Sequence, residues 1–229
     1  MNTTEDQGAG ETDDDLLQIA RNQVARISTA AGLVTPVVVL VDSIEGKGSP
    51  RANAKFTTPD GVPTITVTKA AVRKLPFDVL EVLLGHELGH HADESWWRRK
   101  RRQYLTGWGM AGLLLIGGVL AGAIADSNDA SWIPGLAVAG VGGIVYFRSF
   151  FVFRRNQRVG EVRADVFAAR QHTQVDSARA LFAVWESERP ESPQCRHLRL
   201  PFRSHPYRAT RLKNFEAEHR RNEAGRSAS

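Results

Sequence analysis

Residues 77–92 read FDVLEVLLGHELGHHA, and this stretch decides the fold. Asp78 stands near its start, where a carboxylate favours the helix dipole, so the stretch predicts a helix that begins at its first residue. Helical spacing of four residues places His86 and His90 on one face, one turn apart. Two imidazoles in this arrangement can bind one metal ion, as in the H-E-x-x-H pattern that the residues form.

Glu87, between the two histidines, is the candidate for proton transfer. It lies about 100° further round the helix than His86, so it can reach a metal-bound water without binding the metal. Zinc lowers the pKa of such a water toward about 7, and Glu87 can accept its proton and later protonate a leaving amine. The alternative is an accidental match whose histidines only cap or pack, but the pattern lies in the middle of a predicted helix that follows a strand.

The two glycines of this stretch, Gly85 and Gly89, each cost up to about 1 kcal/mol relative to alanine in a helix. Their presence predicts that another element packs closely against it. Separately, the helix expected from near Arg158 to about Glu188 carries small residues that keep part of it thin enough to approach another helix. These are Ala164, Ala168 and Ala169.

A catalytic zinc needs a third protein ligand and one open position. His91 is a poor candidate because it points away from the face of His86. Glu161 and Asp165 lie one turn apart on the later helix; Glu161 can bind the metal, and Asp165 can orient a ligand histidine or pair with an arginine. From the residues alone, the same pair equally fits a solvated helix surface.

The residues ahead of the motif predict a helix and a small sheet. An amphipathic helix is expected at 15–31, and the run PVVVLVD at 36–42 reads as a buried strand. Residues 53–58 and the alternating TITVT at 64–68 are expected to complete the sheet, the latter with one buried face. Residues 1–14 have the polar, charged composition of a disordered tail.

Two apolar segments follow the motif and predict a transmembrane hairpin. Residues 105–125 contain no charged side chain, and about 20 apolar residues suffice to cross a bilayer. The second segment, 132–153, is interrupted by Arg148. Positive charge flanks both outer ends, at 98–102 and 154–158, which favours a hairpin with both ends in the cytoplasm. Glycines in both segments would let the two helices approach closely.

Two other interpretations of this region are a hairpin buried in a soluble core and a nucleic-acid site at the basic cluster 98–102. A juxtamembrane position explains the cluster without a further partner, so no nucleic acid is expected. The formal net charge of +5 fits either case. The single cysteine, Cys195, excludes an internal disulfide and a paired-cysteine metal site. The polar start of the chain does not look like a signal peptide, so the early part is expected to stay in the cytoplasm.

From about residue 36 to 215 the chain resembles the HtpX-type and CAAX-prenyl-protease-type family of membrane zinc peptidases, which are gluzincins. The resemblance rests on pieces that occur in the order of the family. They are PVVVLVD, Asn53-Ala54, TITVTKAAVRKLP, HELGH at 86–90, the hydrophobic segments, EVRAD at 161–165 as E-x-x-A-D, and His205-Pro206 followed by Arg211.

The resemblance implies that Glu161 is the third zinc ligand and that Asn53 lies on a strand edge that holds an extended substrate by β-augmentation. It also implies that His205 hydrogen-bonds the developing oxyanion and that Arg211 pairs with Asp165. HtpX-like members carry hydrophobic segments ahead of the zinc helix and this chain has none, so we expect its membrane attachment to differ.

The sequence therefore predicts an α+β fold. We expect one mainly helical, zincin-like metalloprotease domain over 15–229, with a small sheet and a transmembrane hairpin inserted at about 104–153. The predicted function is a Zn²⁺-dependent membrane endopeptidase that hydrolyses protein or peptide substrates at a cytoplasm-facing site. The alternative is a catalytically inert, zinc-containing membrane adaptor, against which Glu87 argues because a structural zinc site has no use for it. The sequence gives no signal for substrate choice or oligomeric state.

Overall fold

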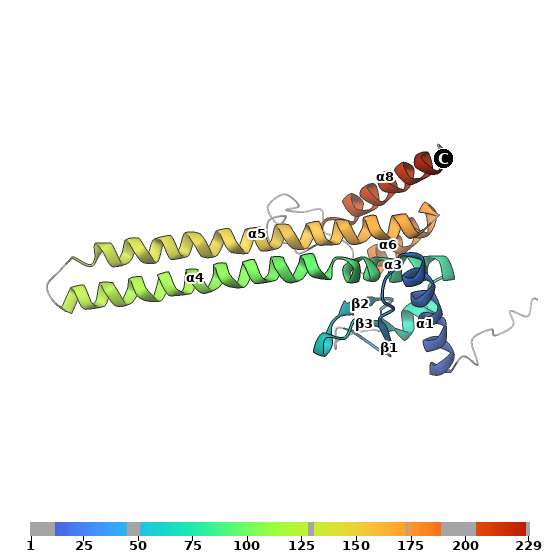
Figure 1. Cartoon of the computed structure of the whole chain (residues 1–229), viewed down its shortest axis with the longest axis horizontal. Coiled ribbons are helices and arrows are strands. Elements are labelled where there is room, and N and C mark those ends of the chain that lie inside the picture. The colour runs from blue at the N-terminus through green and yellow to red at the C-terminus, as the bar shows by residue number, and fades with distance from the viewer. Residues whose placement is uncertain (1–11, 45–50, 128–130, 173, 189–204, 228–229) are drawn as a thin grey trace, which may run out of the picture. The chain divides into compact units, whose positions relative to one another are not determined.

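The computed structural model describes residues 12–44, 51–127, 131–172, 174–188 and 205–227. The predicted tail lies, up to residue 11, outside these ranges. The elements are α1 (Asp13–Ala30), β1 (Val37–Val41), β2 (Ala54–Thr57), the 3₁₀ turn η1 (Pro59–Gly61), β3 (Thr64–Thr68), α2 (Lys69–Lys74), α3 (Phe77–Ala92), α4 (Glu94–Ser127), α5 (Ile133–Gln171), α6 (Val175–Glu188) and α8 (Arg208–Ser227) (Figure 1).

The chain divides into two compact units. The first combines Met1–Asp93, Glu161–Ser192 and Tyr207–Ser229, and the second combines Glu94–Gly160 with Pro193–Pro206. The boundary falls inside α5, so the start of that helix belongs to the second unit and its end to the first. The mainly helical architecture with a small sheet and two long apolar helices confirms the predicted α+β class.

The sheet of the first unit has three strands in the order β1-β3-β2, with β1 parallel and β2 antiparallel to β3. Its central strand is buried on both faces, including Thr68, whose hydroxyl donates to the carbonyl of Arg51 at 2.7 Å. The prediction of one buried face for this strand was therefore wrong. The prediction of a buried β1 was also wrong: β1 is an edge strand, and Val37 and Val39 are 50% and 40% exposed.

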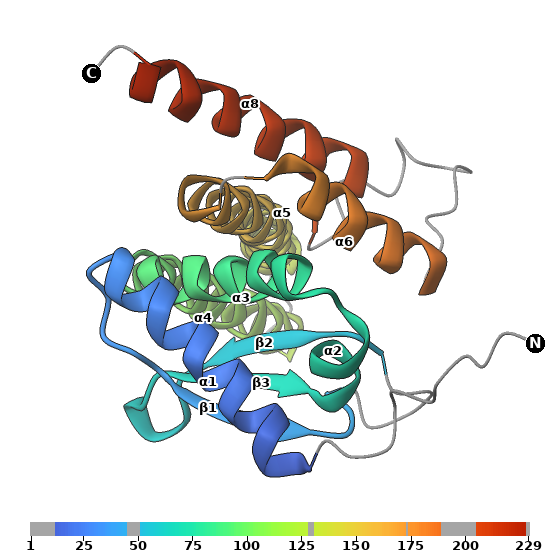
Figure 2. The same cartoon turned by 90° about the vertical axis from the view of Figure 1, so that its right-hand side faces the viewer.

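The core of this unit lies between the sheet and the helices around it. The α1 helix contacts β1, α2 and α3, and α3 also contacts β2 and α6 (Figure 2). A capping box at Thr12 and Asp15 starts α1, which satisfies two backbone N–H groups that the first helical turn leaves unpaired. The apolar face of α1 is buried against the core through Leu16, Ala20, Val24 and Ile27.

The motif helix α3 begins at Phe77 as predicted, and the end of α5 approaches it closely at Gly89. A Cβ atom added to Gly89 would lie 2.6 Å from the Cα of Ala164, closer than folded proteins tolerate. One turn earlier, a Cβ on Gly85 would meet Ala168 at an ordinary 3.5 Å. The prediction that a glycine of the motif helix accommodates a closely packed, alanine-bearing helix is thus confirmed.

The C-terminal helices differ from the sequence prediction. A single helix was expected from Arg158 to Glu188, but α5 ends at Gln171 and α6 starts at Val175. No glycine or proline marks this break; it allows α6 to turn back and pack against α3 and α8. The last helix begins at Arg208 and continues to Ser227.

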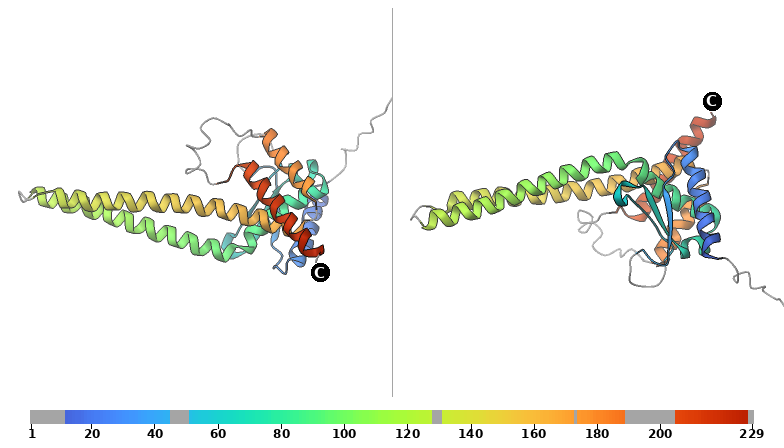
Figure 3. Two further views of the ribbon diagram at one scale, coloured as in Figure 1. Left: turned by 90° about the horizontal axis from the view of Figure 1, so that it is seen from above. Right: turned by 60° about the horizontal axis from the view of Figure 1, so that its bottom comes forward.

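The second unit contains the predicted hairpin, in which α4 and α5 run side by side (Figure 3). A Cβ on Gly118 would lie 2.6 Å from the carbonyl oxygen of Gly135, so small residues allow the helices to touch. The most apolar windows of α4 and α5 are only 11% and 6% buried. The alternative of a hairpin buried in a soluble core is therefore wrong.

We predict that Gly89→Ala destabilises the protein by about 1–3 kcal/mol, because its methyl group overlaps the Ala164 backbone and overpacking carries that cost. Gly85→Ala is the matched control, since its methyl group has room and alanine favours the helix. Thermal unfolding of the detergent-solubilised, metal-free proteins measures both. Equal midpoints for the two variants would contradict the close contact.

Candidate metal centre

Three side chains that can bind a metal converge in the first unit: His86 and His90 from α3 and Glu161 from α5. Their potential ligand atoms all lie within 4.8 Å of one another. Glu161 places one oxygen 3.6 Å from Nε2 of His86 and the other 3.6 Å from Nε2 of His90. Neighbouring ligands of a tetrahedral zinc lie roughly 3.4 Å apart, so the donor set and its spacing fit such an ion.

Glu87 stands beside this group without being part of it. Its carboxylate accepts a hydrogen bond of 2.6 Å from the backbone N–H of Phe56 on β2. Within the described ranges the strand β2 pairs with β3 alone, so this N–H lies on the outer edge of the sheet. The offset of Glu87 from the two histidines that helical geometry predicts is present, and the sheet edge fixes the carboxylate.

A second carboxylate of α5, Asp165, is almost fully buried and contacts both a histidine and an arginine. Its Oδ1 lies 2.9 Å from Nδ1 of His86, and Arg211 from α8 donates to both of its oxygens at 2.7 and 2.9 Å. An Nδ1–H that donates to Asp165 leaves Nε2 of His86 free for a metal. The structure thus brings Arg211 and Asp165 together as the family resemblance implied.

The aromatic support of Arg211 is a feature that the sequence analysis missed. The guanidinium carbon lies 5.4 Å from the ring centre of Phe182 and 5.3 Å from that of Trp185, both on α6. Cation–π contacts at this distance stabilise a desolvated arginine. Two aromatic residues three positions apart on an amphipathic helix are also typical of ordinary core packing, so the sequence carried no separate signal for this role.

Burial decides the proton affinities of two motif residues. It raises the pKa of Glu87 to about 7, because its effect outweighs those of the His86 charge, the Phe56 N–H and the Arg211 charge, which all lower that pKa. It lowers the pKa of His90 to about 4, so this imidazole is neutral at physiological pH. A neutral imidazole is the form that binds metal.

The other two potential ligand groups are governed by their partners. Burial and the charge of Arg211 lower the pKa of His86, but hydrogen bonds to Asp165 and Glu161 outweigh both and raise it to about 9. Burial alone raises the pKa of Glu161, yet the hydrogen bond with His86 and the nearby cations hold it well below its ordinary range. Glu161 is therefore ionised.

Asn53 immediately precedes β2, as expected for a residue at the strand edge. Its backbone pairs with Thr68 of β3, while its side-chain oxygen accepts a 3.0 Å hydrogen bond from the N–H of Ala54. The outward N–H groups of β2, from Ala54 and Phe56, are thus bonded to Asn53 and Glu87 respectively. The edge that the resemblance assigns to substrate carries side-chain acceptors.

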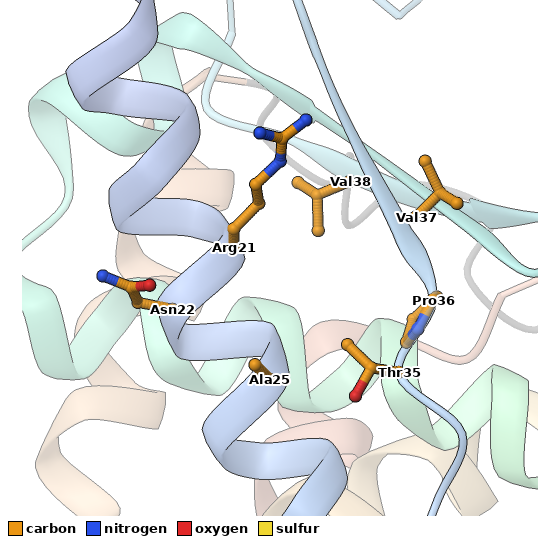
Figure 4. Close-up of a pocket in the computed structure, with 7 residues that line it drawn as sticks. All are labelled: Arg21, Asn22, Ala25, Thr35, Pro36, Val37 and Val38. Atoms are coloured by element: carbon orange, nitrogen blue, oxygen red, sulfur yellow. The ribbon is translucent and has the colours of Figure 1, made fainter.

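Two further features are the predicted His205 and a surface hollow. His205 belongs to the second unit, precedes α8 and is exposed, and its predicted role at the oxyanion stays a prediction. A shallow hollow of about 390 Å³ lies between α1 and β1 (Figure 4), and none of the predicted site residues lines it. Its lining is Arg21, Asn22, Ala25, Thr35, Pro36, Val37 and Val38.

Comparisons with known proteins were made for the whole chain. The family model described as Peptidase family M48 matches residues 18–219. Among solved structures, Ste24p of S. mikatae is similar, with a TM-score of 0.59 and 16% sequence identity over 85% of this chain. The match spans 49% of the Ste24p chain, about half its length, and at this identity it establishes a similar fold. No curated protein sequence matches.

We predict that Asp165→Asn and Arg211→Met each destabilise the metal-free protein by about 3–5 kcal/mol, because each leaves a buried charge without its partner. The double variant should cost clearly less than the sum, which a double-mutant cycle of thermal unfolding reveals. The exposed pair Arg179 and Glu216, 2.9 Å apart, is the control and should show a coupling of about 0–1 kcal/mol. Additive effects at the buried pair would contradict the arrangement.

Proposed function

This chain belongs to peptidase family M48, whose members are metal-dependent, and we propose that it is a zinc endopeptidase of a membrane with its active site in the cytoplasm. The substrates would be proteins or peptides. The membership confirms the family resemblance of the sequence. We propose in addition that the metal is zinc, that the substrates are proteins or peptides, and that the active site faces the cytoplasm.

The observation that carries the proposal is the meeting of three ligand groups from distant parts of the sequence. His86 and His90 lie about 70 residues before Glu161, yet Glu161 has an oxygen 3.6 Å from Nε2 of each histidine. Two imidazoles and one carboxylate are the ligand set of several catalytic zinc sites, which leave one position open. A zinc ion bound there would supply a Lewis acid that polarises a carbonyl and acidifies water.

We assign the proton transfers to Glu87. A general base works best when its pKa lies near the working pH, and burial raises the pKa of Glu87 to about 7. Its carboxylate would accept a proton from the attacking water and return it to the amine nitrogen of the departing peptide. A zinc site with a purely structural role has no need of such a base, which favours the enzyme over the inert adaptor.

Around these groups, Asp165 and Arg211 would hold His86 in the tautomer that exposes Nε2 to the metal. The free edge of β2 next to Asn53 would bind the substrate as an added strand. For that, the N–H groups of Ala54 and Phe56 must exchange their present side-chain acceptors for carbonyls of the substrate. His205 would donate a hydrogen bond to the developing oxyanion.

The membrane part of the proposal rests on the exposure of α4 and α5. Their apolar windows have mean hydropathies of 1.9 and 1.8 and stay almost entirely unburied, which is unfavourable in water. We propose spans at about 105–125 and 132–153. The arginines at both outer ends of the hairpin favour a cytoplasmic position for these ends. The unit that holds the metal-binding residues is joined to these ends and would lie on the same side.

We predict that Glu87→Gln lowers the rate of cleavage of an unfolded test protein by at least about 10²-fold, because the general base is lost. The metal content should be unchanged, since this side chain is not one of the three ligand groups. Purified protein in detergent, with a chelator as a second control, allows the measurement. Metal-loaded wild type that cleaves no substrate in a broad panel would favour the inert adaptor.

We further predict that Glu161→Ala loses most of its bound zinc while keeping its fold, because only the two imidazoles remain. Metal analysis after gel filtration measures the loss, and circular dichroism measures the fold. Glu216→Ala, on the neighbouring α8, removes a partly exposed carboxylate away from the group and should keep the full metal content. Unchanged zinc in Glu161→Ala would remove this residue from the ligand set.

A further inference from the structure

One end of the α4–α5 hairpin carries a concentration of positive charge that the proposed peptidase chemistry does not use. Five basic residues lie on α4 and four on α5, nine in all, whereas residues 103–147 contain no lysine or arginine. We call these nine the basic collar. They are Arg98, Arg99, Lys100, Arg101, Arg102, Arg148, Arg154, Arg155 and Arg158.

Contacts between the helices place both parts of the collar at the same end of the hairpin. Trp97 contacts Gly160 and lies 6.3 Å, ring to ring, from Phe153. About two turns further along α4, Tyr104 stacks on Phe153 at 4.1 Å. The segments 97–104 and 153–160 therefore lie beside each other, and they contain eight of the nine collar residues, all except Arg148.

Most of this charge has no acidic partner in the described part of the chain. Arg98 pairs with Glu94 at 2.6 Å, and Glu94 is the only acidic residue between positions 94 and 125. Five arginines of the collar are exposed and form no ion pair within the described ranges. They are Arg99, Arg101, Arg102, Arg148 and Arg155. An orientation signal alone does not require nine cations, and an uncompensated cluster of this density attracts anions.

Aromatic residues mark the depth at which the collar lies. Trp108 stacks on Tyr146 at 5.0 Å, next to the stacked Tyr104. Tryptophan and tyrosine gather at the level of lipid headgroups, where one end of the ring is wet and the other apolar. Beyond this layer the exposed side chains are aliphatic, for example Leu113 at 69% and Ile144 at 69%. Eight collar residues thus lie on the headgroup side of the Trp108–Tyr146 pair, and Arg148 lies at the level of that pair.

From this geometry we propose that the basic collar binds anionic phospholipids and selects them from the surrounding bilayer. The guanidinium groups pair with the phosphate and the further charge of the headgroup, while the acyl chains lie along the aliphatic surface of the hairpin. The opposite end of α4, with Asp126 and no cation, offers no such site. This inference rests on the membrane part of the proposed function.

Tryptophan quenching tests the proposal, because Trp96, Trp97 and Trp108 belong to the collar end of the hairpin and Trp132 to its other end. The double variant Trp132→Phe/Trp185→Phe keeps tryptophan fluorescence only at the collar end. Its remaining tryptophans are Trp96, Trp97 and Trp108. A second protein keeps only Trp132. Each is reconstituted in equal mixtures of phosphatidylcholine and phosphatidylglycerol in which one lipid or the other carries brominated chains.

At the collar end we expect brominated phosphatidylglycerol to associate on the order of five-fold more strongly than brominated phosphatidylcholine, as for a polybasic segment. The ratio of the two association strengths should approach one in about 1 M salt, where the screening length falls to about 3 Å. This salt test needs no charge variant. The protein with Trp132 alone should show equal quenching by the two lipids.

A variant in which four collar arginines are changed to glutamine should lose the preference for phosphatidylglycerol; these are Arg99, Arg101, Arg102 and Arg155. The matched control changes four exposed cations of the other unit to glutamine, with the same loss of charge, and should keep it; these are Arg21, Lys74, Lys213 and Arg220. Equal quenching by both lipids in the unaltered collar overturns the proposal, as does binding of RNA without a lipid preference. No quenching by either lipid refutes instead the membrane location.

Discussion

The close contact between α3 and α5 is the constraint on which the rest of the site depends. At Gly89 the two backbones approach until a single methyl group would overlap Ala164, and this approach brings Glu161 to His86 and His90. A larger residue at either position would move α5 outward, and a carboxylate side chain is too short to compensate for a displaced helix. The glycine that weakens the helix by about 1 kcal/mol therefore makes the three-ligand group possible.

Bringing these groups together concentrates charged side chains in a buried place. Neighbouring residues compensate these charges through a series of contacts. Arg211 lies against two aromatic rings of α6 and donates to both oxygens of Asp165. Asp165 in turn lies 2.9 Å from His86. Glu87 accepts a hydrogen bond from the backbone N–H of Phe56, and burial raises its pKa to about 7 although the charges of His86 and Arg211 act to lower it. Adjacent carboxylates in one site thus acquire opposite proton affinities from their neighbours.

Much of the fold and of the site was predictable because local periodicity and spacing are properties of the sequence. The i, i+4 histidines, the small residues of the EVRAD helix and the uncharged stretch 105–125 each predicted the element that the structure contains. Predictions failed where burial depends on the neighbour of an element: β1 is apolar in composition but lies at the sheet edge, and the break after Gln171 has no local signal. The aromatic pair that supports Arg211 could not be distinguished from core residues for the same reason.

The sequence by itself determined the elements, the metal-binding face of α3 and the length and charge pattern of the hairpin, since each depends on residues within a few turns of one another. Only the tertiary structure decided that Glu161 reaches both histidines, whereas Asp165 contacts His86 and Arg211. Glu161 and Asp165 are equivalent by spacing, one turn apart. The contact at Gly89 fixes the rotation of α5, and with it directs Glu161 toward both histidines and buries Asp165 against Arg211. Packing between distant segments, which no local pattern encodes, made that choice.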